Sequence, residues 1–169
     1  MKKILTITLI MFFISEISAQ VGEKFKYEMD EFGNYNVTPV FHQTKITGKI
    51  GYVVIKDQKY IEELFTNVIK KNITDEKIKK LSIGTAALLY INSNGEIIYC
   101  SFVINSADVN ILNEDELYNI YIEFKNLKID TSKVYISAES IPPYEKECDY
   151  ALLVVSFVPP EYRTRFLKK

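Results

Sequence analysis

The sequence predicts an α+β domain in which a small antiparallel sheet carries two amphipathic helices on one face. Three observations predict it. Two apolar runs, 85–91 and 96–104, flank a hairpin signal; two helical patterns, 61–69 and 117–127, each have a single apolar face; and an apolar run at 150–158 follows the second helix. The order is therefore helix-strand-strand-helix-strand, preceded by N-terminal extended segments.

Residues 1–19 have the layout of a secretory signal peptide. Lys2 and Lys3 precede an apolar run at 4–14, and small and polar residues lead to a cleavage site after Ala19. The run of 11 residues is shorter than the roughly 20 that a membrane span requires. We therefore expect export to the periplasm, the cell envelope or the extracellular space, with no membrane span after cleavage. An uncleaved anchor is the alternative.

Residues 20–169 form a chain of 150 residues, which is enough for one hydrophobic core. We expect a single domain: extended segments at 20–56, a core at 57–158 and a tail at 159–169. The mature chain has 19 basic and 21 acidic residues. This balance favours neither nucleic acid nor an anionic membrane as a partner.

The first helix follows a strand predicted at 49–56. Asp57 is its expected cap, and Lys70 and Lys71 lie in its last turn, as the helix dipole prefers. The apolar positions fall on one helical face. They are Ile61, Leu64, Phe65, Val68 and Ile69. Thr74 is expected to cap a further short helix.

The hairpin and the second helix carry the strongest local signals. Asn94 and Gly95 join two apolar runs, and both residue types tolerate positive φ. Asn113 and Glu116 have the spacing of a capping box. A short strand is expected at 133–138. The first hairpin strand is expected at the centre of the sheet, flanked by the second and last strands, each antiparallel to it.

A family resemblance extends over residues 60–158. Residues 82–91 read Ser-Ile-Gly-Thr-Ala-Ala-Leu-Leu-Tyr-Ile, the turn continues as Asn-Gly-Glu-Ile, an acidic helix start follows at 112–117, and Pro142-Pro143 precedes the last strand. Together these resemble the C-terminal domain of TonB-type energy transducers, above all the divergent domains common in Bacteroidetes. The family's Tyr-Pro after the first helix and its proline-rich spacer are absent from this sequence. Thr85 occupies the position before the first hairpin strand at which the family usually has a glycine.

The last predicted strand, 150–158, is the candidate site for a partner. In a three-stranded sheet it lies at an edge, and it carries neither a charged residue nor a proline that would block pairing. The candidate edge residues are Tyr150, Leu152, Val154 and Ser156. This strand and the resemblance predict a non-enzymatic domain that binds a protein or peptide by strand addition. Alternatively, the N-terminal segment 24–41 folds back and caps the edge, which would suit a structural envelope domain.

No catalytic residue, metal site or cofactor is assigned. His42 is the only histidine, and it has no recognisable nucleophile signature or zinc-ligand spacing. An alternative reading is a small secreted hydrolase using acidic residues. Its candidates are Asp108, Glu114 and Glu116. Cys100 and Cys148 form a candidate disulfide, which an oxidising compartment permits; two free cysteines are the alternative.

Overall fold

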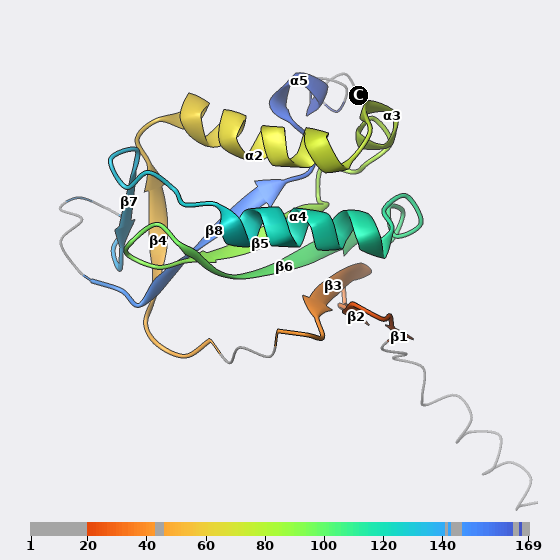
Figure 1. The fold of residues 1–169 in the computed structure, drawn as a ribbon, viewed down its shortest axis with the longest axis horizontal. Helices are drawn as coiled ribbons and strands as arrows, with labels where there is room; N and C mark the ends of the chain where they lie inside the picture. The colour runs from red at the N-terminus through yellow and green to blue at the C-terminus, as the bar shows by residue number, and fades with distance from the viewer. Residues whose placement is uncertain (1–19, 43–45, 141, 143–146, 164–165, 167–169) are drawn as a thin grey trace, which may run out of the picture.

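The described part of the chain forms one mixed sheet of eight strands with helices packed on it (Figure 1). The computed structural model describes residues 20–42, 46–140, 142, 147–163 and 166. The strands are β1 (Gln20–Val21), β2 (Phe25–Met29), β3 (Asn34–Pro39), β4 (Ile50–Ile55), β5 (Ala86–Ile91), β6 (Ile97–Asn105), β7 (Val134–Ser137) and β8 (Tyr150–Ser156). The helices are α2 (Gln58–Asn72), α3 (Asp75–Ile78), α4 (Glu114–Asn126) and α5 (Pro160–Arg163).

The order of the strands corrects the predicted small antiparallel sheet. It is β1-β2-β3-β6-β5-β8-β4-β7, and β4 pairs with β8 in parallel. The three strands placed from the sequence form the middle of this sheet, where β5 lies antiparallel to β6 on one side and to β8 on the other. Their mutual pairing was therefore predicted correctly. The sheet around them was not.

Two additions extend the middle of the sheet. On one side, the β2–β3 hairpin joins the sheet through the pairing of β3 with β6. On the other side, β4 pairs with β8, and β7 pairs with β4. The N-terminal segment therefore pairs on the β6 side of the sheet. The alternative in the sequence analysis had it cap the last strand, which lies on the other side of β5. The predicted signal peptide lies outside the described residues. Among the helices that the structure describes, none combines the length and apolar character of a membrane span.

The hairpin turn differs in detail from its prediction. Gly95 alone takes positive φ, at 79°, and its N–H donates to the carbonyl of Asn92 at 3.0 Å. No non-glycine residue of the described chain has positive φ, so Asn94 does not share this conformation. The turn spans 92–95, and the pairing of β5 with β6 shifts register next to it. A glycine in the left-handed region followed by a register shift is typical of longer hairpin loops.

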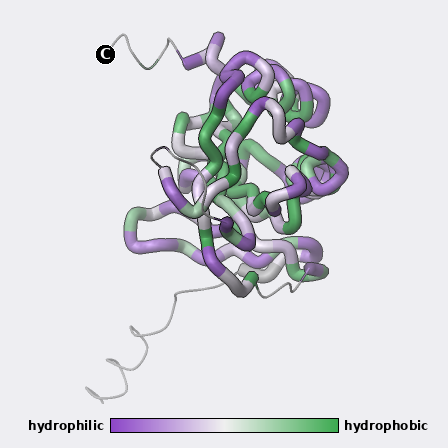
Figure 2. Tube along the Cα trace, turned by 90° about the vertical axis from the view of Figure 1, so that its left-hand side faces the viewer, coloured by the Kyte–Doolittle hydropathy of each residue, from purple (hydrophilic) through white to green (hydrophobic). Residues whose placement is uncertain are grey.

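Both long helices begin where the sequence predicts. The Asp57 side chain accepts from the Tyr60 N–H at 3.0 Å at the start of α2, and Asn113 and Glu116 form the capping box of α4. The two helices lie on the same face of the sheet (Figure 1) and bury their apolar stripes in one core. Phe65 of α2 and Phe124 of α4 meet edge to face at 5.6 Å. Figure 2 shows the apolar segments gathered toward the middle of the molecule.

Candidate functional site

The candidate edge strand β8 lies inside the sheet, and its two halves differ. β8 pairs with β5 from Ala151 to Ser156 but with β4 only from Tyr150 to Leu152. Tyr150 and Leu152 are opposite Ile50 and Tyr52, so the prediction of a free edge is wrong for them. Beyond Leu152 the strands separate. Among the described strands, Val154 and Ser156 are therefore paired only with β5.

In this second half of β8, the main-chain groups of alternate residues point toward the gap. The Phe157 N–H donates to the Thr85 carbonyl of the β5 side at 2.9 Å. In an antiparallel pair such bonds recur at every second residue, so Leu153 and Val155 also face β5. The N–H and C=O groups of Val154 and Ser156 consequently face the side from which β4 has departed.

A cleft of about 150 Å³ lies in that gap. Its walls are the second half of β8, the side of α2 that faces the sheet, the end of β4 and the chain around α5. The apolar lining comes from Ile55, Ile61, Phe65, Ile69, Leu153, Val155, Pro159 and Pro160. Gln58, Glu62, Thr66 and Arg163 add polar groups. The cleft thus combines main-chain hydrogen-bonding groups with an apolar floor, which suits an extended peptide.

Local contacts hold the ends of the cleft in place. Arg163 donates from Nε to the Val158 carbonyl at 2.9 Å, which fixes α5 over the end of β8. Lys70 of α2 forms an ion pair with Glu161 of α5 at 2.6 Å. On the other side, Gln58 donates to Glu62 at 2.8 Å along α2. Three of the polar lining residues, Gln58, Glu62 and Arg163, therefore have hydrogen-bond partners within the protein itself.

The sequence analysis missed the contribution of α2 to this site. Gln58, Glu62 and Thr66 recur every fourth residue, which places them in one line beside the apolar stripe. That line was visible in the sequence. Which strand it faces was not, because the pairing of β4 with β8 joins residues about a hundred positions apart.

The two cysteines do not form the candidate disulfide. Both are free; Cys100 is fully buried and Cys148 is half-buried. Burial raises the pKa of the Cys100 thiol far above its usual range. Cys148 lies instead against Gly51, where a Cβ would collide with its sulfur. Gly51 therefore permits the close approach of β4 to the start of β8.

His42 contacts tyrosines. Its Nδ1 forms a hydrogen bond with the Tyr121 hydroxyl, and its ring meets that of Tyr99 edge to face at 5.7 Å. Burial, and secondarily the charge of Lys125, lowers the pKa of His42. Within the described residues its polar partner is thus a phenol, and the structure does not bring it to a cysteine or serine nucleophile.

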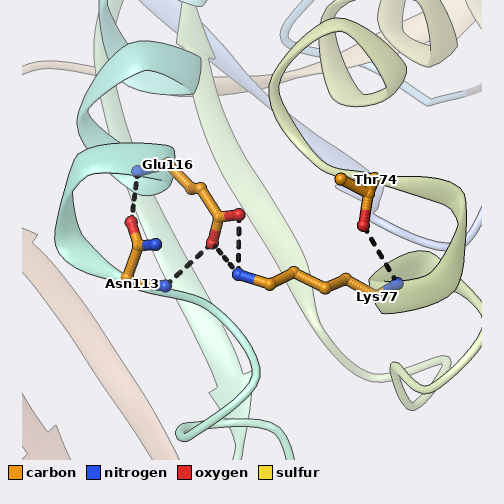
Figure 3. A network of polar contacts seen from close by, with 4 residues as sticks. All are labelled: Thr74, Lys77, Asn113 and Glu116. Carbon is orange, nitrogen blue, oxygen red and sulfur yellow. Dashed lines mark hydrogen bonds and ion pairs between the residues drawn. The ribbon is translucent and has the colours of Figure 1, made fainter.

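The three candidate carboxylates have different surroundings, and the buried Oε1 of Glu114 has no hydrogen-bond partner among the described residues. Asp108 is buried and accepts from the Ser82 N–H at 2.7 Å and the Thr85 hydroxyl at 2.6 Å. Glu116 accepts from Lys77 and from the Asn113 N–H, between α3 and α4 (Figure 3). The Glu114 carboxylate lies against Gly22, near the start of the described residues, and a Cβ added to Gly22 would collide with it.

Each of the first two carboxylates therefore has a structural task. Asp108 joins the chain before β5 to the chain after β6, and Glu116 completes a capping box while it joins two helices. Among the side chains that the structure describes, no group of three or more His, Cys, Asp or Glu residues could hold a metal ion.

Comparison with known proteins identifies a similar fold but no family. No family model matches the chain, and no curated protein matches it. The crystal structure of a DUF5043 family protein from Bacteroides uniformis ATCC 8492 is similar, with a TM-score of 0.54 over 83% of this chain and 89% of that chain. The two sequences are 11% identical, so the likeness concerns the fold alone. The resemblance to TonB C-terminal domains stays a prediction.

Proposed function

We propose that this protein is a non-enzymatic binding domain that takes an extended segment of a partner protein into the cleft beside β8. The segment pairs with the main chain of Val154 and Ser156 and continues the line that β4 leaves at Tyr52. The observation that carries this proposal is the early end of the β4–β8 pairing next to a cleft with both apolar and polar lining residues. Strand addition gives affinity through the main chain, and alternate side chains give specificity.

The partner segment has a definable chemistry. Every second side chain of an added strand points to the covered face of the sheet. There it meets the apolar floor formed by Leu153, Val155 and Phe65. We therefore expect an extended segment with an apolar anchor and small or polar neighbours. The predicted leader places this binding outside the cytoplasm.

Two observations favour binding over hydrolysis. Asp108 and Glu116 are engaged in separate structural contacts. His42 is hydrogen-bonded to Tyr121, a residue of α4. A hydrolase would need a nucleophile or two carboxylates that converge on one pocket. The cleft contains Glu62 as its one carboxylate among the described lining residues.

Hydrogen exchange tests whether the second half of β8 is open. In the free protein, produced from the full coding sequence, the amides of Val154 and Ser156 should exchange much faster than those of Leu153 and Val155, because only the latter pair with β5. Slow exchange at all four positions would favour the structural alternative, in which the edge is already closed.

Selection of binders from a displayed library of random peptides tests the function itself. Selected peptides should slow exchange at Val154 and Ser156. The Val154→Pro variant removes the N–H that faces the cleft and keeps the N–H groups of Leu153 and Val155 that face β5, so it should weaken peptide binding by at least about tenfold while the β5 pairing persists. The matched Val154→Ala variant keeps that N–H and should bind normally. Equal binding by both variants, or bound peptides that leave both amides unprotected, would overturn strand addition.

A further inference from the structure

The sheet has a second face that no described helix covers. Side chains alternate along a strand, so residues opposite one another in the register share a face. One cross-strand row on the uncovered face runs over five adjacent strands. It consists of Tyr99, Tyr90, Leu152, Tyr52 and Ser137. We call the uncovered face of β6, β5, β8, β4 and β7 the outer face.

No strand residue of the outer face is charged, although the ammonium of Lys56, the residue after β4, lies over the Tyr135 ring. Besides that row the face consists of Asn105, Val103, Ser101, Ala86, Leu88, Tyr150, Val154, Ser156, Ile50, Val54 and Tyr135. The same face of the neighbouring hairpin is different. There β2 contributes Lys26 and Glu28, which form an ion pair, and β3 contributes Asn36 and Thr38. Polar residues are what a solvated antiparallel face normally carries.

Large apolar side chains of the outer face are open to solvent. The exposed fractions are 58% for Val154, 54% for Tyr52, 53% for Ile50 and 43% for Tyr135. The centre of the Tyr90 ring lies 5.6 Å from that of Tyr99 and 5.7 Å from that of Tyr150, so these three side chains form one aromatic cluster. Contiguous apolar surface of this kind on a soluble protein marks an interaction site.

We propose that the outer face is a homodimer interface, in which two copies of the chain pack sheet against sheet. The face is uncharged, so its partner must also be uncharged, since a charged group buried there would lose its hydration without gaining a partner. The same face of a second copy meets this condition. In a dimer with a two-fold axis, Leu152 and its neighbours in one copy then pack against the same residues of the other copy. The proposal goes beyond peptide binding, because it uses the side chains of the outer face, and of the outer-face residues named above only Val154 and Ser156 also line the cleft.

The extent of the face suits a dimer. Five strands about 4.8 Å apart, which range from four residues in β7 to nine in β6 at about 3.4 Å each, cover roughly 24 by 22 Å in projection. The accessible area of a surface with protruding side chains exceeds its projection. It therefore approaches the roughly 800 Å² per partner of a stable interface. Lys56, whose Nζ lies 3.5 Å from the centre of the Tyr135 ring, stands at the margin where an interface tolerates charge.

Sedimentation equilibrium over a range from micromolar to submillimolar protein tests the dimer. The unaltered protein should show a monomer–dimer equilibrium, and Tyr52→Glu should weaken it at least about hundredfold, because the symmetric interface would bury the new charge twice. The matched control is Ile122→Glu on the solvent side of α4, where the exposed fraction is 38%. It should dimerise normally.

A second variant guards against misfolding. Ile50→Glu lies on the same face, and its circular dichroism and thermal unfolding should match those of the unaltered monomer while dimerisation is lost. A protein that stays monomeric at every concentration would overturn the proposal. So would a dimer that Tyr52→Glu and Ile50→Glu leave intact. Because neither variant lines the cleft, peptide binding should persist, which separates failure of this proposal from failure of the proposed function.

Discussion

The two faces of the sheet come from the same strands but differ in what they contact. On the covered face Leu89, Cys100 and Phe102 are at most 1% exposed beneath the helices. On the outer face, Val154 and Tyr52 are more than half exposed. Burial on the covered face supplies the free energy of folding. The apolar residues of the outer face contribute little of it in the monomer. This difference is what the proposed dimer would explain, since the outer face would be buried against a second copy.

Among the tests of this comparison, Phe102→Ala should give the largest change in the free energy of unfolding. The ring is 1% exposed and packs edge to face on Phe25 at 5.7 Å and Phe157 at 5.8 Å. Its removal should lower the free energy of unfolding by about 3–5 kcal/mol through lost burial and a cavity. Urea denaturation of dilute protein measures this. The matched outer-face variant Val154→Ala should change the free energy of unfolding by about 0.5 kcal/mol. Equal losses from both variants would end the distinction between the faces.

A smaller effect is expected from the buried carboxylate at the end of the sheet. Asp108 is 1% exposed and accepts three hydrogen bonds, from the N–H and hydroxyl of Ser82 and from the hydroxyl of Thr85. Asp108→Ala leaves these donors without an acceptor and should cost about 2–3 kcal/mol of unfolding free energy. Asp108→Asn keeps one carbonyl oxygen and should cost less. If the alanine variant were as stable as the unaltered protein, the buried polar contacts would contribute nothing.

Local signals explain which parts of the fold could be predicted. Asp57 and Asn113 cap helices through contacts that lie within three residues, and the apolar spacing of each helix is equally local. Gly95 marks the hairpin for the same reason. These features depend on neighbours in the chain, which the sequence displays directly.

Non-local pairing explains what could not be predicted. Tyr52 lies opposite Leu152, a hundred positions away, and no turn residue fixes that register. The parallel β4–β8 pair turned the expected edge strand into an internal one. It also created the cleft, because β4 follows β8 for only part of its length. The site therefore depends on a pairing that the sequence analysis did not contain.

The helix caps give the next smaller effect. Asn113 accepts from the Glu116 N–H at 2.9 Å, and Glu116 accepts from the Asn113 N–H at 3.0 Å (Figure 3). Asn113→Ala should lower the free energy of unfolding by about 1 kcal/mol. Thr74→Ala is the matched control at α3, where the corresponding bond from the Lys77 N–H is 3.4 Å long. It should cost less, and a larger loss from Thr74→Ala would contradict the ranking by geometry.

The smallest effect concerns a partly buried ion pair that belongs to neither face. Asp57 accepts from Lys133 Nζ at 2.9 Å, and this bond, followed by that from the Tyr60 N–H, lowers the pKa of the Asp57 carboxyl. A lowered folded-state pKa contributes stability above the ordinary aspartate value, and that contribution is lost as the pH falls through the lowered pKa. Asp57→Asn retains a good helix cap but does not titrate.

The variant should therefore be slightly less stable than the unaltered protein at neutral pH. The difference should disappear as the pH falls below the ordinary pKa of aspartate toward the lowered folded value. Urea denaturation at a series of pH values measures it. Lys133→Gln removes the principal cause of the shift and should reproduce most of the same pH dependence. A difference that grows as the pH falls would reverse the sign of this argument and show that the charged carboxylate is not stabilised by its partners.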